Sequence, residues 1–336
     1  MLVAATLALS GCELSTVIAG QSSSDTTTST EIESSETQAA LLDVYVGDCA
    51  PPSPVSCDDL SDDPLHVLGL DCPGGIPTSG AVDAPPGALG AHAGSLGPYE
   101  VREGEQVLIL STGIADHLPL AGDQLAAVCE EASLDFCPST RHQQGPMLDL
   151  PAPMTIDPVD PDATCGGRPD PVGQGDCSNT LFAQLTACGG PCEIEDYAEL
   201  RVSLTVPAQV YGLAFDFAFL SVEWPEGENS AFNDMFVAWL ESDSWTGNVS
   251  FDDEGNPITV KSSFRDYTGN ELEGFAMDGQ AGTRWLTTDF GVSPGETVEL
   301  VLAVFDVTDD SIDSVVLLDG FRWTCTGTPP TTAPVP

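Results

Sequence analysis

Residues 211–240 read YGLAFDFAFLSVEWPEGENSAFNDMFVAWL, and this stretch decides the fold of the 336-residue chain. Two apolar runs flank a short loop that is rich in acidic and amide side chains. In the first run, 213–222, phenylalanine recurs at every second position from Phe215, which predicts a strand buried mainly on one side. The second run, 235–240, has the length and aromatic content of another strand. We therefore place this stretch at the centre of a β-sandwich.

Other segments of the chain carry the same signals for short strands. We expect strands at 106–111, 197–206, 283–288, 297–306 and 314–323, and a hairpin made of 248–251 and 258–260. Helical spacing is limited to two short segments, 121–131 and 180–188. Many strands, few helices and frequent turns indicate an all-β chain, folded as a single antiparallel β-sandwich or jelly-roll-like domain with long disulfide-stapled loops.

The chain is strongly acidic, with 53 Asp and Glu against 8 Lys and Arg and a formal net charge of -45. Lys261 is its only lysine. Binding of nucleic acid needs Lys and Arg to neutralise phosphates, so we expect no nucleic-acid partner. Such a surface attracts divalent cations or basic partners, and the alternative is that the acidity only keeps the protein soluble.

The N-terminus resembles that of a bacterial lipoprotein. Residues 1–8 are apolar and are followed by Leu9-Ser10-Gly11-Cys12, which resembles a lipobox, so we assign 1–12 to a signal peptide whose Cys12 takes up lipid. The alternative is an unrelated apolar N-terminus with a chance cysteine. A lipid on Cys12 implies a protein of the cell envelope, either an outer-membrane lipoprotein or a surface-exposed or extracellular protein. It would contact the membrane through this anchor only.

The segments on either side of the expected sandwich are polar or rich in proline. Residues 13–42 are dominated by Ser, Thr and Glu and should form a disordered linker. Residues 43–64 form a Cys/Pro-rich lead-in, and residues 327–336 form a Pro/Thr tail. The sandwich domain is therefore expected over 65–326.

Ten cysteines remain once Cys12 is set aside, an even number that suits up to five disulfides in an exported chain. They are Cys49, Cys57, Cys72, Cys129, Cys137, Cys165, Cys177, Cys188, Cys192 and Cys325. Nearness in sequence suggests the pairs Cys49–Cys57, Cys129–Cys137, Cys165–Cys177 and Cys188–Cys192, which leaves Cys72–Cys325, but spacing alone does not fix the connectivity. A zinc site is the alternative use of these cysteines, although the chain has no C-x-x-C and no nearby histidine pair.

Several motifs, in one order, resemble a choice-of-anchor L domain. They are LHVLGLDCPGG (65–75), GEQVLILSTG (104–113), DYAELRVSLTVP (196–207), FDFAFLSVEWPE (215–226), SAFNDMFVAWL (230–240), NPITV (256–260), GTRWLTT (282–288), PGETVELVLAVFD (294–306) and DSVVLLDGFRW (313–323). The resemblance covers about residues 65–325. It implies a bacterial surface or secreted protein whose type of anchor varies between members, and it supplies no catalytic residues. This chain departs from the family in carrying its expected anchor at the N-terminus.

Acidic and amide side chains gather in the expected inter-strand loops. We take as candidate calcium ligands Glu223, Asn233, Asp234, Asp306, Asp313 and Asp319. Carboxylate and amide oxygens are what Ca²⁺ needs, because it binds about six to eight oxygen ligands. An Asp inside an apolar strand, as at 319, needs a partner since a lone buried charge is costly. The alternative is that these carboxylates are solvated turn residues that cap backbone N–H groups.

The sequence favours a non-catalytic role. No histidine lies in a catalytic motif, and residues 93–97 (AGSLG) do not form a G-x-S-x-G nucleophile elbow. Trp239 and Trp323 are expected to pack on the sheets, whereas Trp224 and Trp245 lie near loops, where they could stack on a sugar ring or pack on the core. We expect a surface-anchored, calcium-stabilised binding or adhesion module of a bacterial envelope, whose partner is an extracellular glycan or protein. The alternative is a secreted hydrolase acting on polysaccharide or envelope polymer.

Overall fold

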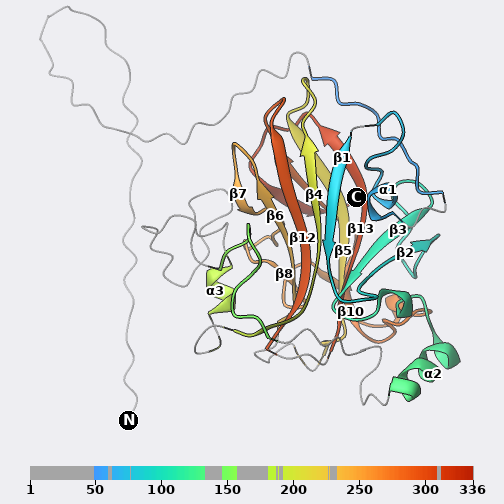
Figure 1. The fold of residues 1–336 in the computed structure, drawn as a ribbon. Coiled ribbons are helices and arrows are strands. Elements are labelled where there is room, and N and C mark those ends of the chain that lie inside the picture. Colours follow the sequence, from blue (N-terminus) through green and yellow to red (C-terminus); the bar gives the residue numbers. More distant parts are fainter. Residues whose placement is uncertain are drawn as a thin grey trace, which may run out of the picture. The chain divides into compact units, whose positions relative to one another are not determined.

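Strand-forming sequence dominates this chain, and its computed structural model is correspondingly all-β (Figure 1). The described residues are 49–59, 63–75, 77–132, 146–156, 181–186, 188, 192–225, 227, 233–308 and 312–335. They belong to one compact unit, Leu42–Pro336. The expected signal peptide, the lipidated Cys12 and nearly all of the linker precede this unit and lie outside the described residues, so those assignments stay predictions.

The elements are many short strands and a few short helices. The strands are β1 (Thr78–Asp83), β2 (Leu89–Ala93), β3 (Gln106–Ser111), β4 (Ile194–Thr205), β5 (Gly212–Ser221), β6 (Met235–Glu241), β7 (Thr246–Asn248), β8 (Ile258–Thr259), β9 (Arg265–Tyr267), β10 (Ala281–Thr283), β11 (Leu286–Gly291), β12 (Thr297–Val307), β13 (Ser314–Thr324) and β14 (Thr331–Pro334). The α-helices are α1 (Pro64–Val67), α2 (Gly122–Ala132) and α3 (Phe182–Leu185), and the 3-10 turns are η2 (Ala115–His117) and η5 (Asn270–Leu272). Among the described residues, no helix has the length and apolar character needed to cross a bilayer.

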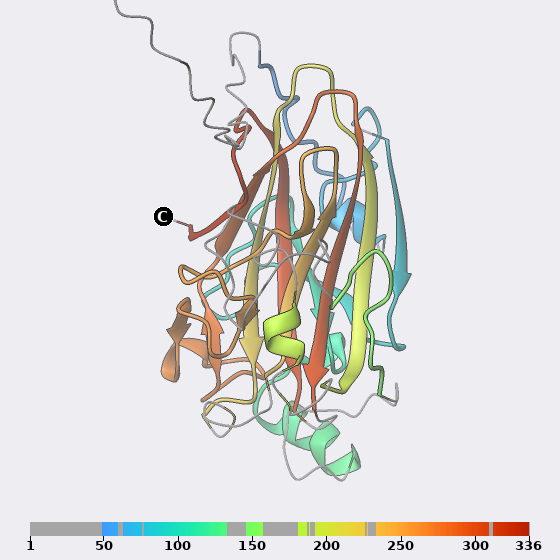
Figure 2. The same ribbon diagram turned by 90° about the vertical axis from the view of Figure 1, so that its left-hand side faces the viewer.

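The strands form two antiparallel sheets that pack face to face (Figures 1 and 2). Sheet A has the order β1-β4-β12-β6-β7, and β8 also pairs with β6. Sheet B has the order β14-β11-β5-β13-β3-β2, and β10 pairs with both β5 and β9. The chain changes sheet repeatedly among the described strands, for example between β5 and β6 and between β12 and β13. The predicted antiparallel β-sandwich is confirmed.

Alternation along the central strands fills the core between the sheets. Phe215, Phe217 and Phe219 of β5 are 0–1% exposed and point into this core. The Phe217 ring lies 4.8 Å from the ring of Phe236 on β6, measured between centroids. On β12 the even-numbered residues from 298 to 304 occupy the same core. Each large apolar side chain buried in this way contributes about 1.5–3 kcal/mol.

The outer faces of both sheets are buried as well. On sheet B, residues of the covering loops such as Tyr99 and Phe275 pack over the odd-numbered side chains of β13. On sheet A, Met154 and Leu185 pack over the odd-numbered side chains of β12. All ten residues of β5 are consequently buried, so the prediction of a strand buried mainly on one side is wrong. The period of two identified the face that carries the phenylalanines, but loops distant in sequence cover the other face.

Other elements also differ from the predicted strands. The expected strand 283–288 is two strands, β10 and β11, with Trp285 in the break between them. The expected hairpin has its turn, where Asp252 N donates to Asn256 O at 2.8 Å, and an isolated antiparallel bridge joins Phe251 to Pro257. Beyond this bridge, β7 and β8 pair with β6 and not with each other. Strands β1, β2 and β14 were not predicted. None of their residues is buried, and they lack the apolar alternation that marks a strand.

The described disulfides correct the predicted pairing. Cys188–Cys192 is confirmed. Cys49 bonds to Cys325 and Cys57 bonds to Cys72, so the predicted pairs Cys49–Cys57 and Cys72–Cys325 are wrong. The fold places the lead-in beside the end of β13, and the Cα atoms of Cys49 and Cys325 are 5.8 Å apart although 276 positions separate them in sequence. Cys129 is also disulfide-bonded, whereas Cys137, Cys165 and Cys177 lie outside the described residues.

Candidate functional site

Four of the six candidate calcium ligands meet at one end of the sandwich. In sheet B, Ser221 at the end of β5 pairs with Ser314 at the start of β13. In sheet A, Met235 at the start of β6 pairs with Phe305 near the end of β12. The residues just beyond these pairs therefore lie close together, at the lower end of the sandwich in Figure 1. We call them the carboxylate cluster: Glu223, Asp234, Asp306 and Asp313.

Hydrogen bonds connect the carboxylate cluster to both sheets. Asp234 Oδ2 accepts a hydrogen bond of 2.8 Å from the Ser314 hydroxyl group of sheet B. Asp234 Oδ1 accepts one of 3.4 Å from Val307 N of sheet A. Glu223 Oε2 accepts one of 3.2 Å from Asp234 N. A single aspartate thus joins the strand ends of the two sheets.

Asp306 is the most deeply buried acid of the carboxylate cluster, with no exposed surface. On β12 the even-numbered side chains face the core, so Asp306 continues the row that ends at Val304. Burial raises the pKa of Asp306 well above its ordinary value, and the charges of Asp234 and Asp313 raise it further. The Thr112 hydroxyl group acts in the opposite direction. Without a bound cation, Asp306 is therefore expected to retain a proton at pH values where an exposed aspartate is ionised.

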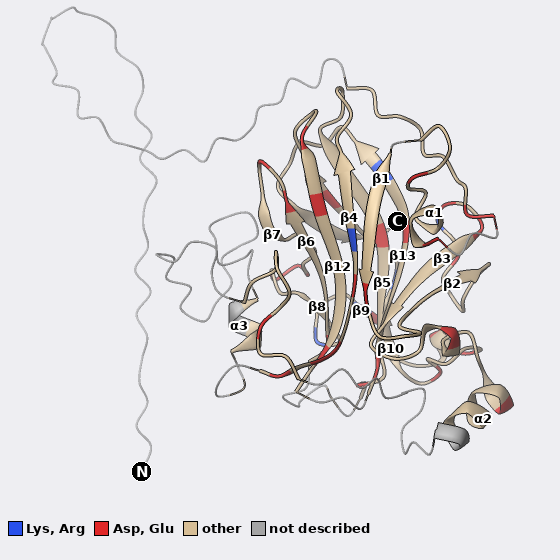
Figure 3. Ribbon diagram, in the orientation of Figure 1, with Lys and Arg blue, Asp and Glu red and all other residues tan. Residues whose placement is uncertain are grey.

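Little positive charge surrounds the carboxylate cluster. Figure 3 shows acidic residues both in connections and within strands, and few basic residues. Lys261, the only lysine of the chain, lies close enough to the cluster for the charges of Glu223 and Asp234 to raise its pKa. Burial has the larger effect and lowers the pKa of Lys261. The four cluster carboxylates are 0–4% exposed, so the alternative of solvated turn residues is wrong. Capping of backbone N–H groups, which that alternative also predicted, is seen at Glu223 and Asp234.

The cluster offers the oxygen ligands that a hard cation prefers. Asn233 precedes Asp234 and adds an amide oxygen. Asn233 Oδ1 and both carboxylate oxygens of Asp306 are buried and receive no hydrogen bond of normal geometry. Among the described residues, no three His, Cys, Asp or Glu side chains form a group that could hold a metal ion. Calcium binding therefore stays a prediction, with its ligands narrowed to the cluster and Asn233.

Asp319 lies apart from the carboxylate cluster. Leu318 faces the core, so the next residue along β13 points to the outer face of sheet B. There Asp319 lies opposite Asp216 of β5 in the register of the two strands. Asp319 accepts hydrogen bonds from the backbone N–H groups of Gly320 at 2.6 Å and Arg102 at 2.7 Å. The expectation that Asp319 joins the other carboxylates is wrong, because alternation along the strand places it on the opposite face.

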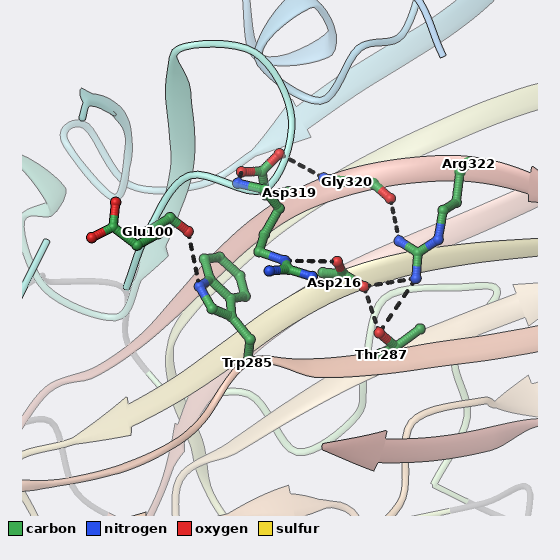
Figure 4. Close-up of polar contacts among 8 residues, drawn as sticks. Glu100, Asp216, Trp285, Thr287, Asp319, Gly320 and Arg322 are labelled. Atoms are coloured by element: carbon green, nitrogen blue, oxygen red, sulfur yellow. Dashed lines mark hydrogen bonds and ion pairs between the residues drawn. The ribbon is translucent and has the colours of Figure 1, made fainter. Parts of the chain in front are cut away.

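Two arginines form ion pairs with Asp216 on this outer face (Figure 4). Arg102 Nε lies 3.1 Å from Asp216 Oδ2, and Arg322 Nη2 lies 2.9 Å from Asp216 Oδ1. The Thr287 hydroxyl group donates a further hydrogen bond of 2.6 Å to Asp216 Oδ1. We call Asp216, Asp319, Arg102 and Arg322 the acid–arginine network. It holds the segment around Arg102 against sheet B, as does the bond of 3.1 Å from Trp285 Nε1 to Glu100 O that Figure 4 also shows.

Sequence reasoning missed the acid–arginine network, although part of it had a signal. Asp216 falls between two phenylalanines of one strand, so the same period of two that buries the rings sends its carboxylate to the other face. Burial raises the pKa of Asp319 to about 7, against the lowering effect of its backbone hydrogen bonds. Arg102 lies in an irregular segment far away in sequence, and nothing local to it indicates its partner.

A cavity of about 150 Å³ lies beside the end of β13. Its walls come from the lead-in, from the loop after α1 and from the end of β13. They include Pro52, Pro54, Val55, Gly69, Leu70, Gly74, Gly75, Leu213, Phe321, Arg322 and Trp323. These three wall segments adjoin Cys49, Cys57, Cys72 and Cys325, so the disulfides Cys49–Cys325 and Cys57–Cys72 hold the walls together.

The tryptophans divide between core and surface partly as expected. Trp239 is fully buried, which confirms its packing role. Trp323 packs on the core but is only partly buried and lines the cavity. Trp224 lies under the guanidinium group of Arg265, 4.1 Å from its ring centroid, and Trp245 packs on the core.

Comparison with known protein families, with curated proteins and with solved structures finds no match for this chain. The resemblance to a choice-of-anchor L domain therefore rests on the quoted motifs alone.

Proposed function

We propose that this chain is a non-catalytic binding or adhesion module of a bacterial envelope, of the choice-of-anchor L kind and anchored through a lipid on Cys12. Its described disulfides support a place outside the cytoplasm, because such bonds persist mainly in oxidising compartments. The lipobox-like residues 9–12 support the anchor. The strong negative charge speaks against a nucleic-acid partner.

The cavity beside β13 is the observation that carries the binding role. Its volume of about 150 Å³ is below the roughly 300–1,000 Å³ of pockets that enclose a drug-sized ligand. It therefore suits one group of a larger ligand, such as a single sugar ring of a glycan or one side chain of a protein. The Trp323 ring offers a stacking surface and Arg322 lies beside it. Walls fixed by two disulfides need little ordering when a ligand binds, which favours affinity.

A glycan array and a peptide array, probed with the intact chain, test this role. We expect a specific ligand whose binding is lost in Trp323→Ala and kept in Trp245→Ala. The two tryptophans are matched, because both are partly buried and pack against the same core. Equal binding by both variants would show that the cavity is not the binding site. The absence of any ligand on either array would contradict the binding role itself.

The anchor is tested separately in a bacterial host that carries the lipoprotein-processing pathway. Cys12→Ser should abolish incorporation of labelled fatty acid and release the chain from the membrane fraction. Incorporation of label that persists in Cys12→Ser would disprove the assigned lipidation site.

The second candidate function is a hydrolase of polysaccharide or envelope polymer. Asp306 favours it, because burial and the charges of Asp234 and Asp313 raise the pKa of its carboxyl group, and an acid with a raised pKa can donate the proton that such hydrolysis needs. Their exposure of 0–4% argues against it, since a polymer cannot reach a buried acid without movement of the sandwich ends. Turnover of a polymer library that disappears in Asp306→Asn would favour the hydrolase.

A further inference from the structure

Strand β1 forms an open edge of sheet A. Among the described strands only β4 pairs with it, in an unbroken antiparallel register from Thr78 opposite Leu204 to Asp83 opposite Glu199. Figure 2 shows β1, in cyan, at the right-hand margin of the described ribbon. In an antiparallel pair, alternate residues direct their N–H and C=O groups to the partner strand, so half of the residues of β1 direct these groups away from β4. Such an edge is able to pair with a further strand.

Strand β1 lacks the features that usually protect an edge from pairing. Its sequence, TSGAVD, contains no proline and no basic residue, and no bulge interrupts its register with β4. With six residues, it is longer than the other described strands that end a sheet, which are β2, β7, β8, β9 and β14. Of these edges, β1 therefore offers the longest row of backbone groups to another chain.

Val82 gives this edge an apolar contact surface. Its side chain is 47% exposed, and among the described residues it is the one exposed large apolar side chain that lies in a strand. Val82 lies opposite Leu200, which faces the core between the sheets, so Val82 points to the same inner face. An added strand would place one of its own apolar side chains against Val82 and so extend the core.

Acidic side chains flank both ends of β1. Asp83 is its last residue and is exposed. At the other end, the exposed Asp71 accepts a hydrogen bond of 3.4 Å from the backbone N–H of the first residue of β1. Arg201 on the neighbouring strand β4 is already ion-paired, with Nη2 2.9 Å from Glu199 Oε1 and Nη1 3.3 Å from Glu299 Oε1. A strand that pairs with β1 therefore meets negative charge at both of its ends.

This charge decides which occupant fits the edge. If β1 strands of two copies paired in antiparallel fashion, Asp83 of each copy would lie near Asp71 of the other, and like charges so placed repel. Each copy also carries a net charge of -45. The chain's own segment 13–42 contains acidic residues but no Lys or Arg, so it is repelled as well. A segment with basic residues is instead attracted at both ends.

We propose that β1 is a docking edge for an extended, basic segment of another protein, which pairs with β1 as an added strand of sheet A. Such a segment has apolar side chains at every second position, which pack against Val82. It also has Lys or Arg residues about 20 Å apart, the length of a six-residue strand, which reach Asp71 and Asp83. The edge goes beyond the proposed function, because no residue of β1 lines the cavity beside β13.

Fluorescence anisotropy with the intact chain tests this edge. The probe is a labelled peptide with blocked termini, Lys-Val-Thr-Val-Thr-Val-Lys, used at about 0.15 M ionic strength. We expect saturable binding that weakens as salt is added, because salt screens the attraction to the two aspartates. The same peptide with N-methyl groups on two adjacent residues, one for each of its edges, keeps its charge but loses backbone donors and should not bind.

Val82→Lys and Leu148→Lys provide the matched comparison, because each replaces an exposed apolar residue and each adds one positive charge. Val82→Lys should weaken peptide binding by about tenfold or more, since it removes the apolar contact and places a like charge against the basic segment. Leu148→Lys should bind as the wild type does. Asp83→Lys should weaken binding of this peptide and strengthen binding of the peptide with Glu at both ends, a reversal that general destabilisation cannot produce.

Four outcomes would overturn the proposal. The first is the absence of saturable binding to the wild-type chain. The second is equal binding of the N-methylated peptide, which would show attraction by charge alone. The third is equal affinity of Val82→Lys and Leu148→Lys. The fourth is a wild-type dimer, seen by analytical ultracentrifugation, that Val82→Lys dissociates, because the edge would then belong to a second copy. Trp323→Ala should keep peptide binding, so failure of the cavity can be told from failure of the edge.

Discussion

The bond between Cys49 and Cys325 closes almost the whole described chain, and its removal should be among the most costly single changes to the fold. It spans 276 positions, whereas Cys188–Cys192 spans 4. In the chain-entropy description, a disulfide destabilises the unfolded state by an amount that grows with the logarithm of the loop length. The relation gives about 5–6 kcal/mol for the long loop and about 2 kcal/mol for the short one at 25 °C.

Two double variants compare these loops directly: Cys49→Ser with Cys325→Ser, and Cys188→Ser with Cys192→Ser. Most measured disulfide contributions do not exceed about 5 kcal/mol, so we expect the first variant to lose roughly 3 kcal/mol more stability than the second. The assay is equilibrium unfolding in guanidinium chloride, followed by tryptophan fluorescence. The denaturant dependence should also become steeper in the first variant, because its unfolded chain exposes more surface.

Equal losses in the two double variants would refute the reasoning. The long loop would then either be unclosed in the folded protein or contribute little through the entropy of the unfolded chain. Peptide mapping without reduction separates these explanations, because only a closed loop yields a peptide that contains both Cys49 and Cys325.

Three further predictions concern single side chains. Asp216→Ala should lower the free energy of unfolding by about 3 kcal/mol, the low end for breaking a buried ion pair, because the arginines are 35% exposed. Asp253→Ala, at an exposed turn, should change it by less than about 0.5 kcal/mol. Equal effects of the two variants in urea titrations would show that the acid–arginine network does not stabilise the fold. Asp319 has a folded pKa of about 7 against an ordinary 3.8, so the folded state binds its proton more tightly and loses stability as pH rises from about 4 to 7. Asp319→Asn should therefore gain stability relative to the wild type across this window, by up to about 4 kcal/mol, and a difference between the two proteins that does not change with pH would contradict the shift. Phe217→Ala should lower the free energy of unfolding by about 3–5 kcal/mol in urea titrations. Val82→Ala, at a side chain that is 47% exposed, should leave it nearly unchanged. A small loss for Phe217→Ala would mean that the two sheets do not pack through the Phe217 ring.

The central strands were predictable from the sequence because their apolar residues recur along each strand. Each of the runs that form β5, β6, β12 and β13 has enough apolar residues to be predicted as a strand without knowing which strands lie beside it. Edge strands lack this signal, as β1 shows with five of its six residues exposed. Strand β14 could not be predicted either, because it lies in a Pro/Thr segment and pairs with β11 through backbone groups, which most sequences provide.

The candidate site was predictable in part for a related reason. Asp234 and Asp306 lie next to the ends of strands that the sequence reveals, so their meeting follows once those strands pair. The exclusion of Asp319 was also within reach, since counting from Leu318 places it on the other face. The complete burial of Asp306 could not be predicted, because it depends on how closely the ends of the two sheets approach each other. The partners of Cys49 and Arg102 were equally hidden, since each lies more than a hundred positions away.

The Cys49–Cys325 bond determines how a mechanical force would travel through the molecule. A tether that pulls at residue 49 passes its tension through a covalent bond to the residue that follows β13. The cavity walls at Pro52 and Trp323 lie within a few residues of the same bond. If a ligand in this cavity held a cell against flowing liquid, the force would therefore pass mainly through the short covalent path between residue 49 and the cavity wall. The hydrogen-bonded strands would lie to the side of that path, and drag would not peel them apart.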